Sequence, residues 1–363
     1  MYRPGMEKLP LYEIHDEPMC LAKLDANERS VPLRGAVKKQ IGRELINVET
    51  RLYPDMAATQ LRKVLASAYQ LSPEQVAVGN GSSELIATVC SAFGGSGRPI
   101  AFVWPSFSMY PIYAAMADSP AVVAPLDEEF KLSVSTTVER VEKSGAKLLI
   151  LCNPNNPTGG VIPADDLRKI LRQVSCPVLM DEAYYEYCGE TCLPWLADFP
   201  NLMIARTFSK AFGLAAARVG YLLASPELIS SIGKRILPYH MNSFSLAAAE
   251  TCFAHREDLM EEVQRTIKRR IKMQKRLEKM RGVEVFSSET NFLLLRVQDP
   301  EKLNNCLAVH GIGVRNLSHV PELRGCLRIT IGNPVEGLLV CDFVQKYATD
   351  LPRTKGGGKS HEK

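Results

Sequence analysis

The sequence predicts an α/β protein in which a mostly parallel, doubly wound sheet is joined to a smaller α+β domain. From residue 75 to 250, short apolar runs alternate with stretches of helical spacing, as in βαβ units. A long amphipathic helix is predicted over 257–280, and apolar runs at 283–286, 291–297, 314–315 and 326–331 predict a second group of strands. The 363 residues exceed one ordinary core, so two domains are expected.

The expected organisation is an N-terminal arm, two domains and a tail. The arm covers 1–30 and is predicted to be irregular, the large domain covers 31–250, and the small domain covers 251–352. Residues 353–363 are polar and rich in glycine, which predicts a disordered tail.

Composition is that of an ordinary globular protein, with 46% hydrophobic and 23% charged residues and a net charge of +4. Much of the basic excess lies in the long helix and the tail, which favours a solvated helix face over a nucleic-acid surface. Ten cysteines without paired spacing indicate buried, reduced thiols rather than disulfides or a zinc site. With no signal peptide and no apolar run long enough for a membrane, we expect a cytoplasmic protein without membrane or nucleic-acid partners.

The first half of the chain contains a candidate anion site. Helical spacing over 34–48 and 59–69 flanks a turn at Tyr53-Pro54, and a short strand at 75–78 leads through Gly79–Glu84 into a helix at 85–93. Glycines and a helix N-terminus after a strand suit a bound anion, with Gly81 and Ser82 as candidates. Helix capping alone also explains a turn rich in glycine and serine.

Three further predicted strands, at 99–104, 147–152 and 176–180, end in polar segments. Open α/β sheets bind ligands at the carboxyl ends of such strands. Asn156 lies in the loop Asn153–Gly160, which is either part of a site or a plain turn, and Leu167–Val174 is helical. Asp181 ends the third strand, where a buried carboxylate needs a partner such as a protonated ring nitrogen; the alternative is a cap on the next element.

Lys210 follows an apolar strand at 202–205 and the hydroxyls of Thr207 and Ser209, and Arg218 stands eight positions later. A desolvated lysine near cations has a lowered pKa and becomes a Schiff-base nucleophile, although a solvated loop lysine is the alternative. Hydroxyls and an arginine suit a phosphate. Together these residues describe a pocket for an aldehyde that carries a phosphate, such as pyridoxal 5′-phosphate (PLP). No metal site is predicted.

The order GNGSSE, WPSFSMY, NPNNPTG, DEAY and RTFSKAFGLAAAR resembles that of the fold-type I, class I/II PLP-dependent aminotransferases. Tyr53-Pro-Asp, the segment LDANE, the segment SFSMY and the ending Leu327–Gly332 resemble histidinol-phosphate aminotransferases. The resemblance covers roughly residues 10 to 350 and implies the fold-type I architecture.

The resemblance implies a role for each candidate that contacts the cofactor. Lys210 binds PLP as a Schiff base and later moves the substrate proton, and Asp181 pairs with the pyridine nitrogen. The ring is further held by Asn156 and Tyr184, which bond its O3′, and by Phe107, which stacks on it. The implied phosphate ligands are Gly81, Ser82, Thr207, Ser209 and Arg218.

Substrate and partner roles are implied in the same way. Arg328 binds the substrate's carboxylate or phosphate, and Arg315, Tyr12 and Asn27 line the same pocket. Tyr53 matches a tyrosine that reaches the neighbouring subunit's cofactor, which implies a homodimer. The implied reaction converts L-histidinol phosphate and 2-oxoglutarate into imidazole acetol phosphate and L-glutamate.

The chain departs from the family pattern at three places: Asn27-Glu28-Arg29-Ser30 replaces NENP, Ser83 replaces an acid, and GLAAAR replaces GLAGLR. Arg29 either favours a phosphorylated or dicarboxylate substrate or is a surface charge. The alternative activities are an aromatic or broad-specificity aminotransferase and a threonine-phosphate decarboxylase. A non-catalytic binding module is disfavoured by the intact lysine, aspartate and arginines, and a nicotinamide dehydrogenase lacks its glycine fingerprint.

Overall fold

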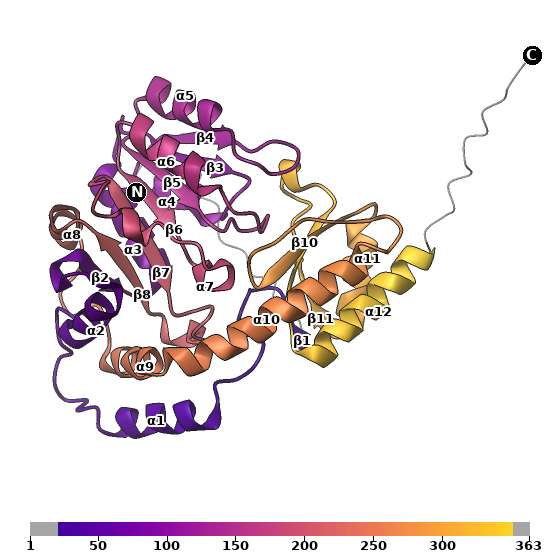
Figure 1. Ribbon diagram of the computed structural model, residues 1–363, viewed down its shortest axis with the longest axis horizontal. Helices are drawn as coiled ribbons and strands as arrows, with labels where there is room; N and C mark the ends of the chain where they lie inside the picture. Colours follow the sequence, from indigo (N-terminus) through magenta and orange to yellow (C-terminus); the bar gives the residue numbers. More distant parts are fainter. Residues whose placement is uncertain (1–20, 351–363) are drawn as a thin grey trace, which may run out of the picture.

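The computed structural model describes residues 21–350, so Tyr12 and the predicted tail lie outside the described residues. Figure 1 shows a large sheet flanked by helices and a smaller sheet beside it, with the long helix α10 (Arg256–Leu277) running from one to the other. This arrangement confirms the predicted α/β class.

Within the described residues, the large sheet has seven strands in the order β2-β8-β7-β6-β5-β3-β4. Parallel pairs join β4, β3, β5, β6 and β7, whereas β8 is antiparallel to both β7 and β2. The sheet is therefore mostly parallel, as predicted. Its strands are β2 (Val76–Gly79), β3 (Ile100–Trp104), β4 (Ala121–Pro125), β5 (Leu148–Cys152), β6 (Val178–Asp181), β7 (Leu202–Thr207) and β8 (Gly220–Ala224).

Both faces of the large sheet are buried, which explains why its strands are continuous apolar runs. Along β5, Leu149 and Leu151 pack into one core cluster and Leu148 and Ile150 into another. The first cluster is covered by α2 (Thr59–Tyr69), α5 (Val134–Ser144), α6 (Ala164–Gln173) and α9 (Ser243–Ala254), with α1 (Gly35–Ile46) packed on α9. The second is covered by α3 (Gly81–Phe93), α4 (Met109–Met116) and α8 (Pro226–Gly233).

The small sheet has the order β12-β13-β10-β9 and a core of its own. It packs against α11, α12 and the end of α10, and every pair in it is antiparallel. Its elements are β9 (Val283–Val285), β10 (Phe292–Val297), β12 (Arg315–Asn316) and β13 (Cys326–Thr330), with α10 (Arg256–Leu277), α11 (Pro300–Val309) and α12 (Pro334–Asp350).

The structure differs from the sequence prediction at the end of the N-terminal arm. Residues up to 30 were expected to be irregular, but β1 (Ala22–Lys23) pairs in parallel with β11 (Ile312–Gly313). Ala22 and Leu24 lie in the small core, which gives this short strand its apolar anchor. The described part of the arm is thus fixed to the small core through a separate two-stranded sheet.

The helix α3 begins four residues earlier than predicted, at Gly81. The Glu84 carboxylate accepts a hydrogen bond from the Asn80 backbone N–H at 2.6 Å, so the glycine and serine residues form the first helical turn. The edge strand β4 has no predicted counterpart because most of its residues are not buried.

The nine cysteines that the structure describes are free thiols, and seven of them are buried, as predicted. Among residues 21–350, no helix is both long and apolar enough to cross a membrane. The same residues contain no group of three or more His, Cys, Asp or Glu side chains placed to hold a metal ion.

Candidate active site

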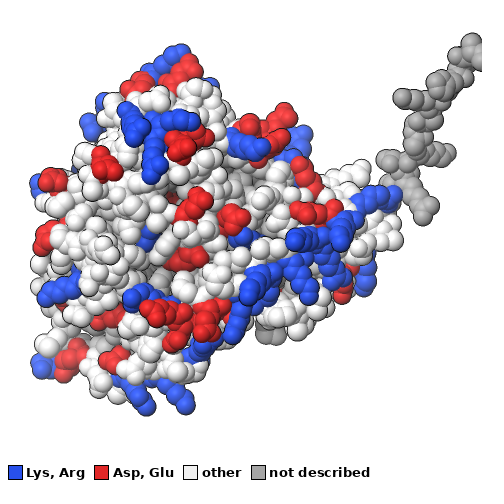
Figure 2. Space-filling view, viewed as in Figure 1, with Lys and Arg blue, Asp and Glu red and all other residues white. Residues whose placement is uncertain are grey.

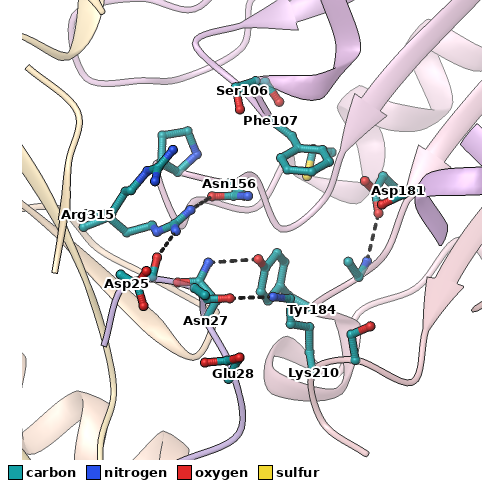
Figure 3. A pocket seen from close by; sticks show the side chains of 18 of the residues that line it. Asp25, Asn27, Glu28, Ser106, Phe107, Asn156, Asp181, Tyr184, Lys210 and Arg315 are labelled. Carbon is teal, nitrogen blue, oxygen red and sulfur yellow. Dashed lines mark hydrogen bonds between the residues drawn. The ribbon is translucent and has the colours of Figure 1, made fainter. Parts of the chain in front are cut away.

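The carboxyl ends of four neighbouring parallel strands meet at one cavity between the two sheets. Its volume of about 780 Å³ is in the range of small-molecule sites. The cavity lining includes the last residues of β3, β5, β6 and β7, which are Trp104, Cys152, Asp181 and Thr207. Figure 3 shows Asn156, Asp181, Tyr184 and Lys210 gathered around this space.

Lys210 stands three residues after the end of β7 and lines the cavity. Its Nζ donates to the Ala26 carbonyl oxygen at 2.8 Å. Burial lowers the pKa of Lys210 to about 7, and the cations of Arg328 and Arg218 act in the same direction. A substantial fraction of this amine is therefore uncharged and nucleophilic at neutral pH.

Asp181 ends β6 and is 4% exposed. Burial raises its pKa to about 6, opposed by hydrogen bonds to the carboxylate. The Tyr110 hydroxyl donates to Oδ2 at 2.8 Å and the Ala183 N–H donates to Oδ1 at 3.2 Å. Both donors are neutral, so a cation inside the cavity would complete the pairing of this carboxylate.

Asn156 and Tyr184 both line the cavity, and each is held there by a hydrogen bond to a different residue. The Asn156 Oδ1 accepts from Arg328 Nη1 at 2.6 Å, and the Tyr184 hydroxyl accepts from Asn27 Nδ2 at 2.9 Å. Burial raises the pKa of Tyr184, which keeps its phenol protonated. Both side chains thus present polar atoms to the cavity in fixed positions (Figure 3).

The loop that carries Asn156 is held by Asn155, a residue that the sequence did not single out. Its Nδ2 donates to the Pro105 carbonyl oxygen at 3.0 Å and to Thr158 Oγ1 at 2.8 Å, and its Oδ1 accepts from Ser106 Oγ at 2.6 Å. Asn155 therefore joins the loops after β3 and β5. Only its place in an asparagine-rich loop signals this in the sequence.

Four of the five predicted phosphate ligands line the cavity, and the fifth, Gly81, lies beside Arg218. The four are Ser82, Thr207, Ser209 and Arg218, and Arg218 Nη1 donates to Ser209 Oγ at 3.3 Å. Gly81 has a φ of +80°, and a Cβ there would lie 2.7 Å from Arg218 Nη2. The left-handed backbone conformation favours glycine here, and the absent side chain leaves room for the guanidinium where it lies.

Arg315 and Arg328 face the cavity from the small sheet and are directly opposite each other on β12 and β13. Like charges in that register repel, so the pair is typical of a site that binds an anion. Arg328 Nη2 also donates to the Asp25 carbonyl oxygen at 2.5 Å.

The arm segment 25–29 forms a strap across the cavity. Its backbone carbonyls accept from Lys210 and Arg328, as described above, and the Asn27 N–H donates to Thr330 Oγ1 at 3.0 Å. Arg29 does not line the cavity. Its Nη1 donates to the Ala211 carbonyl oxygen at 2.6 Å, so it anchors the strap to the lysine loop and is neither of the two alternatives left open by the sequence.

Of the remaining candidates, Phe107 lines the cavity, with its ring 5.6 Å from that of Tyr110 in an edge-on contact. Tyr53 does not line it: the side chain is 81% exposed and stacks on Tyr239 at 4.7 Å. Tyr12 lies outside the described residues. The sequence prediction missed the lining residues Asp25, Glu28, Trp104 and His319.

A buried ion pair supports the site from behind and was also missed. Arg206 of β7 donates through Nε and Nη2 to Glu182 Oε2, at 3.0 and 2.8 Å. Glu182 directly follows Asp181, and Arg206 stands four residues before Lys210. The pair therefore joins the strand ends that carry the two central residues.

The comparisons with known proteins agree with this geometry. The family model "Aminotransferase class I and II" matches residues 21–341. A histidinol-phosphate aminotransferase from Caldanaerobacter subterraneus is 38% identical over 322 residues, which are 89% of this chain and 91% of the relative. One from Clostridium novyi is 36% identical over 95% of this chain and 96% of the relative.

Solved structures show the same fold. The histidinol-phosphate aminotransferase from Sinorhizobium meliloti, in complex with pyridoxal 5′-phosphate, has a TM-score of 0.87 at 24% identity and covers 97% of this chain and 98% of that one. The L-threonine-O-3-phosphate decarboxylase from Porphyromonas gingivalis has a TM-score of 0.79 at 22% identity and covers 91% and 100% of the two chains. At these identities the likeness concerns the fold, whereas the family model and the curated relatives match most of the sequence. From the model match and the shared cavity of lysine, aspartate and arginines, we conclude that the chain belongs to the class I and II aminotransferases.

Proposed function

We propose that this protein is a PLP-dependent aminotransferase that acts on L-histidinol phosphate and 2-oxoglutarate and releases imidazole acetol phosphate and L-glutamate. The observation that best supports this substrate is the cross-strand arginine pair Arg315–Arg328, which faces the same cavity as Lys210. Two guanidinium groups on one wall suit a phosphate or a carboxylate. Curated relatives that match most of the chain are histidinol-phosphate aminotransferases, which supports this choice of substrate.

The residues in the cavity fit PLP. The guanidinium of Arg218 beside the left-handed Gly81 suits the phosphate, and Asp181 is a buried carboxylate whose hydrogen-bond donors are neutral. The cofactor would be held by Lys210, Asp181, Asn156, Tyr184, Phe107 and the phosphate ligands Gly81, Ser82, Thr207, Ser209 and Arg218. When bound, PLP supplies the conjugated ring that delocalises the electron pair left on the substrate carbon.

The chain's own residues supply position, charge and proton transfer. Lys210 Nζ, with a pKa of about 7, accepts and returns a proton near neutral pH. Asp181 would supply the negative charge that pairs with the pyridine nitrogen, and Arg328 and Arg315 would orient the substrate's anionic group. Asn27 and the strap fix Tyr184 and Lys210 in these positions.

We also propose a homodimer in which Tyr53 completes the neighbouring cavity. Several exposed apolar side chains fall in two segments, one from the end of α1 to the start of α2 and one leading into the first turn of α9, and the Tyr53–Tyr239 stack joins the two segments. Such a patch is typical of a protein interface. Its members are Ile46, Leu52, Tyr53, Met56, Leu237, Tyr239 and Phe244. The nine free thiols support a cytoplasmic location.

The activity is tested by supplying single amino donors to the PLP-loaded protein with 2-oxoglutarate and measuring glutamate and carbon dioxide. We expect rapid glutamate formation with L-histidinol phosphate and slow formation with L-phenylalanine. Fast glutamate formation with phenylalanine alone would make the protein an aromatic aminotransferase. Release of carbon dioxide from O-phospho-L-threonine without glutamate would make it a decarboxylase.

A further inference from the structure

One of the two residues that donate a hydrogen bond to the Asp181 carboxylate has so far been given no role in the site. Tyr110, on the first turn of α4, donates its hydroxyl to Asp181 Oδ2 at 2.8 Å, and neither side chain is more than 4% exposed. This phenol comes from a different layer of the fold, since α4 covers the sheet face and Asp181 ends β6. The contact therefore joins a helix to the carboxylate at the strand end.

Packing fixes Tyr110 in this position. Its ring centroid lies 6.3 Å from that of Phe102 and 5.6 Å from that of Phe107, and its N–H donates to the Phe107 carbonyl oxygen at 3.0 Å. The ring is fully buried, so the hydroxyl cannot exchange Asp181 for water. The same turn of chain thus places Phe107 against the cavity and Tyr110 behind it.

The carboxylate needs such a donor because its surroundings favour the protonated form. Burial raises the pKa of Asp181, and the hydrogen bond from Tyr110 is the largest opposing effect. The titratable groups around Asp181 are Tyr110 and Tyr113 of α4, Cys152 of β5, Glu182 directly after β6, Tyr184, and Lys210 after β7. Of these, Lys210 is the cation, and it contributes less than Tyr110 does.

We propose that Tyr110 is a positioning residue that keeps the Asp181 carboxylate ionised and turned toward the ring nitrogen of bound PLP. The phenol binds Oδ2 and the Ala183 N–H binds Oδ1, so each oxygen keeps acceptor capacity for a donor in the cavity. This inference rests on the proposed use of PLP and assigns a role to a residue outside the cavity lining. A tyrosine that served only for packing would be replaced by phenylalanine without effect on the cofactor.

The test compares the wild type with Tyr110→Phe, which keeps the ring and removes the hydroxyl. The dissociation constant of PLP is measured by equilibrium dialysis from pH 6 to pH 9. We expect Tyr110→Phe to bind PLP about tenfold more weakly near pH 7, as for the loss of one charge-assisted hydrogen bond. The pH below which binding weakens is expected to rise, because the variant's Asp181 stays protonated to a higher pH.

Two controls separate the proposed role from a structural one. Tyr113→Phe removes a buried hydroxyl from the same helix, and it should keep the wild-type pH dependence. The analogue 1-deazapyridoxal phosphate, with a C–H group in place of the ring nitrogen, should bind wild type and Tyr110→Phe within about twofold of each other, because the ring then offers Asp181 no N–H.

A double-variant cycle gives an independent readout. In an Asp181→Asn background, Tyr110→Phe should cost no further PLP affinity, because the carboxylate that it serves is gone. Unchanged PLP affinity in Tyr110→Phe, or equal weakening for PLP and the deaza analogue, would overturn the inference while leaving the proposed function intact. Failure of the wild type itself to bind PLP would instead overturn the proposed function.

Discussion

Single residues in the cavity take their reactivity from their immediate neighbours. Lys210 lies in a partly desolvated position among cations, and Asp181 is buried with neutral donors, so the two pKa values move toward each other, to about 7 and about 6. Near neutral pH one group is thus ready to lose a proton and the other remains largely ionised.

Covalent uptake of PLP by the apoprotein should become faster as the pH rises through about 7, because the attacking amine of Lys210 must be unprotonated. Arg328→Gln removes a neighbouring cation, so the pKa of Lys210 rises and the midpoint should move up, by up to about one pH unit. Stopped-flow absorbance at a series of pH values measures this. Arg324→Gln, an exposed arginine of the same region, is the control, and a midpoint that falls in Arg328→Gln would contradict the explanation.

Arg29→Ala should destabilise the fold without changing substrate choice. The variant leaves the Ala211 carbonyl without its donor, which is expected to lower the free energy of unfolding by about 1–3 kcal/mol. The preference for histidinol phosphate over histidinol, measured as a ratio of kcat/KM values, should stay within about twofold, whereas Arg315→Gln should reduce it about tenfold or more. If Arg29→Ala lost the preference for histidinol phosphate, Arg29 would have to contribute to substrate binding, contrary to this prediction.

Among the secondary-structure elements, β6 and β7 position the two central residues of the cavity. Asp181 ends β6 and Lys210 follows β7, and both must face the same cavity. Their parallel pairing sets the strand ends side by side, and the buried pair Glu182–Arg206 joins them through side chains. The Arg206 guanidinium also lies 3.6 Å from the centroid of the Tyr185 ring, so it is enclosed on several sides.

Glu182→Ala should therefore lower the free energy of unfolding by about 3–5 kcal/mol, because Arg206 would remain buried without its anion. Urea denaturation followed by circular dichroism gives this value. Glu190→Ala, an exposed glutamate nearby, should change it by no more than about 0.5 kcal/mol. Equal effects of the two substitutions would show that the buried pair does not hold these strands.

Some of these elements and site residues can be predicted from the sequence, and others cannot. Apolar runs predicted β5, β6 and β7 within two residues, and the polar residues at their ends correctly located the cavity. The edge strand β4 was missed because it lacks the apolar run of a buried strand. Tyr110, Asn155 and Arg206 were missed because each acts through a contact with a residue distant in the chain, and local pattern does not encode such contacts.

At the scale of the whole molecule, Figure 2 shows a basic ridge along α10, whereas basic and acidic side chains are interspersed elsewhere on this face. Exposed lysines at 268, 272, 275 and 279 recur at helical spacing. The buried side of the helix contacts the large core near its start and the small core near its end. The ridge is therefore the solvated side of a connector, as the sequence predicted.

The proposed dimer predicts complementation between inactive variants. Lys210→Ala removes the lysine of its own site, and Tyr53→Ala removes the residue proposed to serve the other subunit. Subunit exchange between them should restore about a quarter of wild-type activity, because half of the dimers are hybrids with one intact site. Lys210→Ala mixed with Asp181→Asn should restore none, since both residues belong to one subunit's site. Equal recovery in both mixtures, or none in either, would contradict a Tyr53 that acts across the interface.

The strap also sets the order in which a newly made chain can complete its cavity. Asn27 leaves the ribosome early, yet its backbone N–H bonds Thr330, 303 positions later. Asn291 Nδ2 likewise bonds the Asn27 carbonyl oxygen at 3.0 Å. Until β13 has been synthesised, the segment that accepts the lysine's hydrogen bond lacks its bond to Thr330, and its other contacts with the small domain wait for Asn291 and β11. The cavity is therefore finished last during translation, and a nascent chain that stops before residue 326 should form much of the large sheet but hold cofactor only weakly.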